Sequence, residues 1–118
     1  NNFTIIHSLD GYDEISLTGD TKVITNDGEK ILTAEFLGKR TVKPQDIHGG
    51  DSVEAAAKIF LNILKGEGTW SQNAVVLANS AMALQCTGKY SSYEECYQLA
   101  VNSLESGSAL KVLQKLVG

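Results

Sequence analysis

The spacing of apolar residues separates the chain into a first part of strands and loops, residues 1–50, and a helical second part, residues 51–118. Phe3–His7 is short and rich in β-branched residues, which predicts a strand. Ala34–Asp46 holds the only proline, Pro44, and is predicted to be an irregular connection. The sheet-forming residues are therefore expected within the first third of the chain.

A β-hairpin is predicted between residues 22 and 33. The runs Lys22–Thr25 and Lys30–Thr33 are separated by the turn Asn26-Asp27-Gly28. Asp-Gly suits the positive φ angles of a tight turn, so the two runs are expected to pair as antiparallel strands. Three short strands make a small sheet, and we expect it to continue in a segment outside these residues and to leave an edge or a face exposed.

The helical part begins with a strong amphipathic pattern. Asp51 is predicted to cap the first helix, with Glu54 completing a capping box, and Gly66 is predicted to stop it. Lys58, Asn62 and Lys65 fall on the polar side. The residues at helical spacing form one apolar stripe: Val53, Ala56, Ala57, Phe60, Leu61 and Leu64.

Three further helices are predicted. The first, about Ser71–Thr87, is apolar nearly all round, which places it in the middle of a core. The next starts near Ser91 or Ser92, with Glu94 and Glu95 placed for capping. Its predicted stripe is Tyr93, Cys96, Tyr97, Ala100, Val101 and Leu104. Gly107 precedes a short last helix that contains Leu110, Leu113 and Leu116. A few strands followed by about four helices predict an α/β fold class.

Composition narrows the classes of function. The chain is 42% hydrophobic and 20% charged, as in ordinary globular proteins, and its 118 residues amount to one domain or part of one. Its longest apolar run, Ala74–Ala83, is interrupted by Asn79 and Ser80, so no membrane span is expected. A net charge of −4 without a cluster of Lys and Arg argues against nucleic-acid binding. Cys86 and Cys96 are predicted to be reduced core residues.

An acidic loop between the first two predicted strands carries the strongest candidate chemistry. Asp10, Asp13 and Glu14 place three carboxylates within five positions. Mg²⁺ in proteins prefers carboxylate oxygens and is usually held by one or two of them together with phosphate and water. Adjacent residues of a regular strand point to opposite faces, so Asp13 and Glu14 share a site only if the backbone bends, and Gly11 permits that bend. The alternative is that these acids are simply solvated.

Other motifs have structural interpretations. Gly49-Gly50-Asp51 precedes a helix, where an anion could bind, but a turn followed by a capped helix explains it better. His7 and His48 are far apart in sequence, and neither lies in a nucleophilic arrangement; His7 could border a pocket near the acidic loop. Trp70 is an isolated aromatic residue. No catalytic acid, base or nucleophile is assigned, and no substrate-binding residue is identified.

The acidic loop also carries a family resemblance. Ile6–Val23 resembles the segment VHGxDGLDExSxTGxTxV of anthranilate phosphoribosyltransferases. Further matches follow in order. Asp46–Asp51 resembles the family's dLrGGd turn, and Lys65–Gly68 followed by Gln72–Ala81 resembles its lxGexGpxrdaVlLNAA stretch. Ser106–Ala109 resembles its dSGxA motif. The ordered matches cover almost the whole chain.

The resemblance implies a function and a place in a larger protein. The family transfers phosphoribose from phosphoribosyl pyrophosphate to anthranilate in tryptophan biosynthesis, and its adjacent Asp–Glu pair, here Asp13 and Glu14, holds Mg²⁺. It implies that residues 1–118 are the C-terminal part of an α/β domain, truncated and inactive alone, because the family's GTGGD phosphate loop, its anthranilate-contacting residues and its dimer-forming helical domain lie upstream. The complete protein is expected to be a homodimer. No signal peptide is visible, which favours the cytoplasm.

Ser8 departs from the family pattern, which usually has glycine after the histidine, and this puts a close backbone approach there in doubt. Two other interpretations stay open. One is a fragment of a related pyrimidine nucleoside phosphorylase-like protein, which the segment matches favour less. The other is a catalytically silent relative that binds nucleic acid, against which the net charge of −4 counts.

Overall fold

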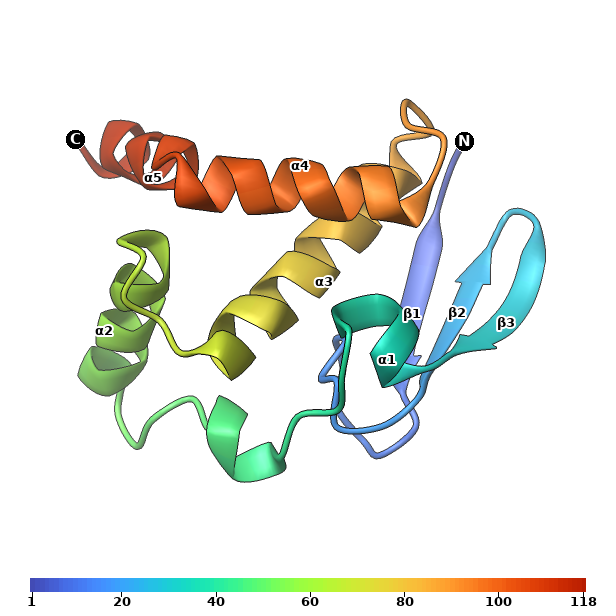
Figure 1. Ribbon diagram of the computed structural model, residues 1–118, viewed down its shortest axis with the longest axis horizontal. Coiled ribbons are helices and arrows are strands. Elements are labelled where there is room, and N and C mark those ends of the chain that lie inside the picture. Colours follow the sequence, from blue (N-terminus) through green and yellow to red (C-terminus); the bar gives the residue numbers. More distant parts are fainter.

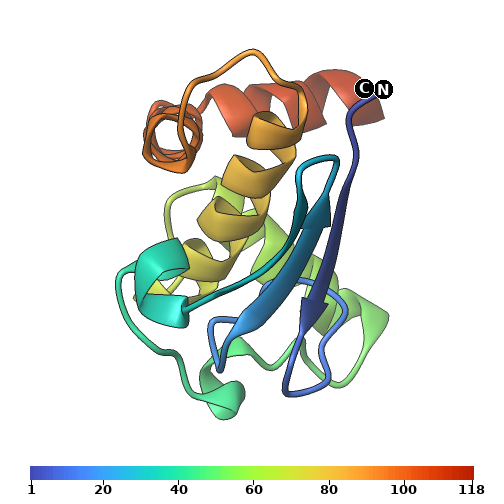
Figure 2. The same cartoon turned by 90° about the vertical axis from the view of Figure 1, so that its right-hand side faces the viewer.

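The computed structural model describes all residues, 1–118, and begins with a three-stranded antiparallel sheet (Figures 1 and 2). The strands are β1 (Thr4–Ser8), β2 (Thr21–Thr25) and β3 (Gly28–Leu32), in the order β1-β2-β3. Because side chains alternate along each strand, one face presents Val23 to the helices and the other carries Ile5 and Ile31. Ile5 and Ile31 are each 55% exposed, so the predicted exposed face is confirmed.

The predicted hairpin is confirmed, and only the glycine of its turn has a positive φ. Thr25 pairs with Gly28 across the two-residue loop Asn26-Asp27. Positive φ is confined to Gly28, at 120°, while Asn26 and Asp27 stay in the negative range that non-glycine residues prefer. The Asn26 side-chain oxygen accepts the Phe3 N–H at 3.0 Å, and this bond ties the turn to the start of β1.

The prediction of an irregular segment at Ala34–Asp46 is wrong. The segment forms the short helix α1 (Ala34–Gly38) and most of the 3₁₀ helix η1 (Pro44–Ile47). Thr33 caps α1 by accepting the Phe36 N–H at 3.1 Å. Pro44 stands in the first turn of η1, where no backbone N–H is needed, so the proline begins a helix here rather than preventing one.

The cap of helix α2 (Val53–Leu64) stands one residue later than predicted. Ser52, not Asp51, caps the helix, and its side chain accepts the Ala55 N–H at 3.0 Å. No bond from Glu54 completes a capping box. The predicted stop is confirmed, since Gly66 adopts the left-handed conformation with φ 83°.

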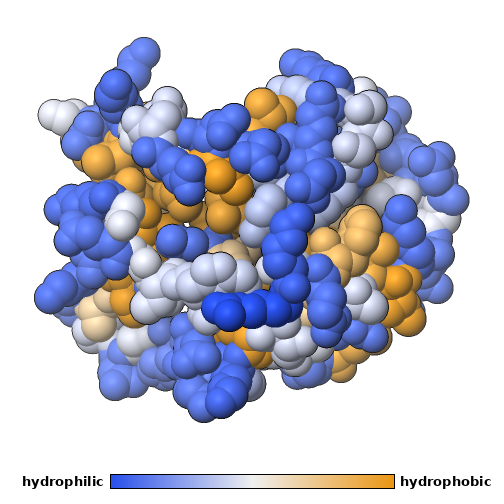
Figure 3. Space-filling view, in the orientation of Figure 1, coloured by the Kyte–Doolittle hydropathy of each residue, from blue (hydrophilic) through white to orange (hydrophobic).

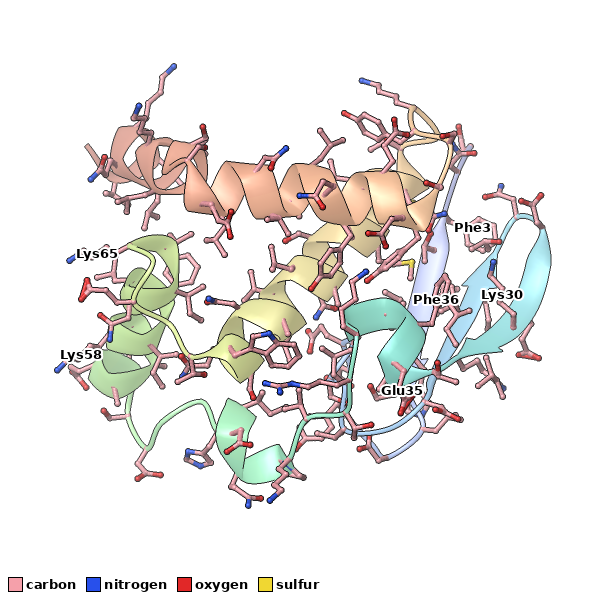
Figure 4. The ribbon with its side chains drawn as sticks, viewed as in Figure 1. Phe3, Lys30, Glu35, Phe36, Lys58 and Lys65 are labelled. Atoms are coloured by element: carbon pink, nitrogen blue, oxygen red, sulfur yellow. The ribbon has the colours of Figure 1, made fainter.

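The apolar stripe of α2 is largely exposed within these residues. Val53 is 82% exposed and Phe60 52%, whereas Ile63 is buried. Figure 4 shows Lys58 and Lys65 directed away from the rest of the molecule, and Figure 3 shows apolar surface between α2 and the last two helices. The side of α2 that is buried or half-buried carries Ala55, Ile59, Asn62 and Ile63, so the expectation that Asn62 lies on the solvent side is wrong. The stripe that the periodicity marks faces solvent within these residues.

Helix α3 (Trp70–Cys86) runs through the middle of the molecule, as predicted (Figure 1). Thr69 and Gln72 form a capping box at its start. α3 contacts α1, η1 and α4 (Tyr93–Glu105), and α5 (Ser108–Val117) continues beyond α4. The buried residues of α3 are small apart from one methionine, which lets neighbouring elements approach closely: Ala74, Ala78, Ala81 and Met82.

The last two helices follow the sequence pattern closely. Ser92 caps α4, and every predicted stripe residue is buried except Val101, which is half-buried. Cys96 is fully buried and Cys86 partly so, and both are free thiols, as predicted. Burial raises the pKa of the Cys96 thiol. None of the helices has both the length and the apolar character needed to cross a membrane.

Candidate functional site

The acidic loop, residues 10–19, connects β1 to β2 and folds back on the end of β1. The Ser8 N–H donates to the Tyr12 carbonyl at 3.1 Å, and the Gly11 N–H donates to the Ser8 carbonyl at 3.0 Å. Gly11 has φ 107°, a conformation that other residues rarely adopt, so the predicted bend at this glycine is confirmed. Asp13 and Glu14 follow directly after this bend.

Two buried side chains anchor the second half of the loop. Ile15 is 1% exposed and Leu17 is fully buried. Leu17 has φ 63°, an unusual value for a leucine, and its carbonyl accepts the Val42 N–H at 2.7 Å. Its side chain lies against the backbone of α1, where a Cβ added to Gly38 would stand 2.4 Å from Leu17 Cδ1. The strained leucine is therefore accommodated because position 38 has no side chain.

A tyrosine on α4 holds α1 in place against the loop. The Tyr93 hydroxyl donates to the Leu37 carbonyl at 2.5 Å, and its ring lies 5.5 Å from that of Phe36. Burial raises the pKa of Tyr93 well above its usual value, so the phenol stays protonated and keeps donating. The loop thus rests on α1, and α1 rests on α4.

Hydroxyl groups link the two ends of the loop. Ser8, which is fully buried, donates from Oγ to the Glu14 carbonyl at 2.7 Å and lies 3.1 Å from Ser16 Oγ. Ser16 Oγ lies 2.7 Å from Thr18 Oγ1, which in turn donates to the Asp10 carboxylate. Asp10 is therefore committed to a bond within the loop.

Asn79 of α3 fixes the loop from the other side. Its Oδ1 accepts the Ile15 N–H at 3.0 Å, and its Nδ2 donates to the Ile15 carbonyl at 2.9 Å. The same Nδ2 donates to the Val75 carbonyl at 2.9 Å, one turn earlier in the helix. Both polar groups of a buried loop residue are thereby satisfied by one amide.

The carboxylates of Asp13 and Glu14 are exposed and adjacent in sequence. Neither takes part in the three ion pairs of the chain or in a side-chain hydrogen bond. Two unengaged carboxylates on an ordered turn fit the oxygen donor set of Mg²⁺. No group of three or more His, Cys, Asp or Glu side chains is arranged to hold a metal, so no third side chain of these types joins Asp13 and Glu14.

The other sequence candidates lie apart from the acidic loop. His7 is exposed on the outer face of β1. His48 Nδ1 accepts the Gly50 N–H at 3.2 Å, which makes Gly49-Gly50-Asp51 a turn before a capped helix, as predicted. Trp70 stacks under Arg40, whose guanidinium carbon lies 3.6 Å from the centre of the indole ring. None of these contacts brings a further polar group to Asp13 or Glu14.

Sequence reasoning missed Asn79 and Gly38 as residues that shape the loop. A signal for Asn79 was present, because an amide in the longest apolar run of the chain must find a buried partner. Gly38 carries no such signal. Its role depends on Leu17, which is distant in sequence and packs against it only in the folded chain.

Comparison with known proteins identifies the family. Residues 1–110 match the sequence profile described as "Glycosyl transferase family, a/b domain". Anthranilate phosphoribosyltransferases from Flavobacterium johnsoniae and Christiangramia forsetii are each 52% identical over 115 residues. In both cases the match covers 98% of this chain and 34% of the relative, so the chain spans about a third of the length of these relatives.

Solved structures agree with the sequence comparison. Anthranilate phosphoribosyltransferase from Thermus thermophilus superposes with a TM-score of 0.84 at 29% identity, over 97% of this chain and 34% of that protein. The Saccharomyces cerevisiae enzyme, solved with 4-fluoroanthranilate, superposes with a TM-score of 0.82 at 21% identity, over 96% of this chain and 34% of that protein. At this identity the likeness supports the fold alone. The resemblance and the α/β fold class drawn from the sequence are both confirmed. The chain therefore belongs to the glycosyl transferase family, within the stretch described as its a/b domain.

Proposed function

We propose that this chain works as part of an anthranilate phosphoribosyltransferase in tryptophan biosynthesis. The observation that carries the proposal is the 52% identity to enzymes of that name over 98% of the chain, acidic loop included. In the proposed reaction the amino nitrogen of anthranilate forms a bond to C1 of the ribose of phosphoribosyl pyrophosphate. The bond from C1 to the pyrophosphate oxygen breaks, and the amine loses a proton.

Asp13 and Glu14 are proposed to hold Mg²⁺ in this reaction. A bound Mg²⁺ would neutralise charge on the pyrophosphate and make it a better leaving group. The support is local: both carboxylates are exposed, unengaged and displayed on an ordered turn. Mg²⁺ usually takes one or two carboxylates and completes its shell with phosphate and water, so a pair suffices if the substrate supplies the rest.

The proposal extends to the location, the oligomeric state and the substrates of the complete protein. We expect a cytoplasmic homodimer whose dimer contacts come from a helical domain that these 118 residues do not include. The substrates are expected to be phosphoribosyl pyrophosphate and anthranilate, without nucleic acid or membrane. The net charge of −4 supports small-molecule substrates, because nucleic-acid binding relies on clustered Lys and Arg.

A transfer assay tests the proposed reaction. The complete gene product that carries this chain is incubated with phosphoribosyl pyrophosphate, anthranilate and Mg²⁺. We expect anthranilate fluorescence to fall while pyrophosphate accumulates in equal amount, and chelation of the metal to stop both. The isolated 118-residue chain is the matched sample, and we expect no transfer from it.

The same assay separates the alternatives. Phosphorolysis of pyrimidine nucleosides without anthranilate transfer would favour the nucleoside phosphorylase interpretation. Retention of nucleic acid at physiological salt without either activity would favour the silent relative. Transfer by the isolated chain would show that these residues contain a complete site.

A further inference from the structure

We propose that Ser8 and Asn79 are positioning residues that fix the peptide group between Glu14 and Ile15 and thereby orient the Asp13–Glu14 carboxylates. The proposal rests on the proposed metal role of that pair and adds to it two residues that touch neither substrate nor metal. Ser8 stands at the end of β1, and Asn79 stands in the middle of α3. They are 71 positions apart in sequence and meet at one peptide bond.

The geometry of that peptide bond is the main argument. The Glu14 carbonyl and the Ile15 N–H are the two polar ends of a single planar unit. Ser8 Oγ donates to the carbonyl at 2.7 Å, and Asn79 Oδ1 accepts from the N–H at 3.0 Å. With both ends held, rotation of the plane would break two hydrogen bonds at once, each worth about 0.5–1.5 kcal/mol net.

The neighbouring peptide groups are held as well. The Tyr12 carbonyl accepts the Ser8 N–H at 3.1 Å, and the Ile15 carbonyl accepts Asn79 Nδ2 at 2.9 Å. Asp13 and Glu14 lie between these fixed points. Ser8 therefore binds the backbone before the pair through its N–H and the carbonyl of Glu14 through its hydroxyl. Asn79 binds both backbone groups of Ile15, the residue that follows the pair.

Burial makes these bonds specific. Ser8 is fully buried, and its hydroxyl has two neighbours, the Glu14 carbonyl and Ser16 Oγ. A glycine at position 8 would leave the Glu14 carbonyl without this donor. Groups that orient a ligand without touching the metal commonly change metal affinity about 10–100-fold when removed.

The test uses Ser8→Ala and Asn79→Ala in the complete protein that carries this chain, with two matched controls. Thr21→Val removes a buried hydroxyl on the strand beside Ser8 that has no hydrogen-bond partner in the protein. Ser80→Ala removes a hydroxyl next to Asn79 on the same helix. Amide hydrogen exchange at Ile15 reports on the peptide group itself, and titration with Mn²⁺ reports on the carboxylate pair.

We expect each positioning variant to speed exchange at Ile15 about 10-fold or more relative to amides of α3 and α4, and to weaken Mn²⁺ binding about 10-fold. Both controls should leave both readouts unchanged. Ser8→Ala is the gentler variant and keeps the test valid if Asn79→Ala does not fold. Faster Ile15 exchange without weaker Mn²⁺ binding would overturn the proposal, as would unchanged exchange.

The metal role can fail separately from the positioning role. Unchanged Mn²⁺ binding after Asp13→Asn with Glu14→Gln would refute the proposed metal site. Exchange at Ile15 would then decide alone whether Ser8 and Asn79 hold the turn.

Discussion

Replacing Asp13 with Asn and Glu14 with Gln together should lower phosphoribosyl transfer by the complete protein about 100-fold or more. Both substitutions keep the shape of the side chain and remove its charge. The carboxylates make no hydrogen bond or ion pair within the chain, so the free energy of unfolding should change by less than about 0.5 kcal/mol. Transfer rates at saturating Mg²⁺ and thermal unfolding of the same sample measure both effects.

The matched control for that double variant is Asp20→Asn combined with Asp27→Asn. Both of these acids are exposed, and their replacement removes the same total charge from the same end of the chain. We expect near-normal transfer from the control. If the Asp13/Glu14 variant also kept near-normal activity, the assignment of the metal to this pair would be wrong.

Gly38→Ala should destabilise the chain by about 1–3 kcal/mol, as overpacking of a filled core does. The added Cβ would lie 2.4 Å from Leu17 Cδ1 and 3.2 Å from Leu17 Cγ. Leu17 is fully buried and already holds φ 63°, so neither its side chain nor its backbone has free space to move into. Chemical denaturation of the wild-type and variant chains measures the loss.

Gly49→Ala is the matched control for this substitution. A Cβ at position 49 would meet nothing within 4 Å, so the same change of residue should alter stability by less than about 0.5 kcal/mol. Equal stability of the Gly38 and Gly49 variants would show that Leu17 does not depend on the missing side chain at position 38. The acidic loop would then have another source of order.

Much of the fold follows from local pattern. The hairpin is set by the turn at Asn26–Gly28, and α4 by its Ser92 cap and an apolar stripe that the structure buries. These features were predictable because their signals lie within a few residues of the element they determine. The short helix α1 was missed although its Thr33 cap is local too, because five residues are too few for a period to show.

The remaining differences depend on tertiary structure. The stripe of α2 has the right period, yet Val53 is 82% exposed, because a period shows which side of a helix is apolar and not what covers that side. The residues of the candidate site likewise fall into those that the sequence reveals and those that only the folded chain reveals. Asp13 and Glu14 stand out in the sequence, whereas the roles of Asn79 and Gly38 emerge only when α3 and α1 pack against the loop.

The most direct test of the metal-binding turn is to locate a bound cation on the chain itself. Mn²⁺ prefers the same oxygen ligands as Mg²⁺ and broadens nuclear magnetic resonance signals near its site. Titrated into the ¹⁵N-labelled chain, Mn²⁺ should broaden the amide signals of residues 11–15 first, and the Asp13→Asn, Glu14→Gln variant should lose this selectivity. First broadening at other acids, such as Glu94 and Glu95 at the start of α4, would contradict the account.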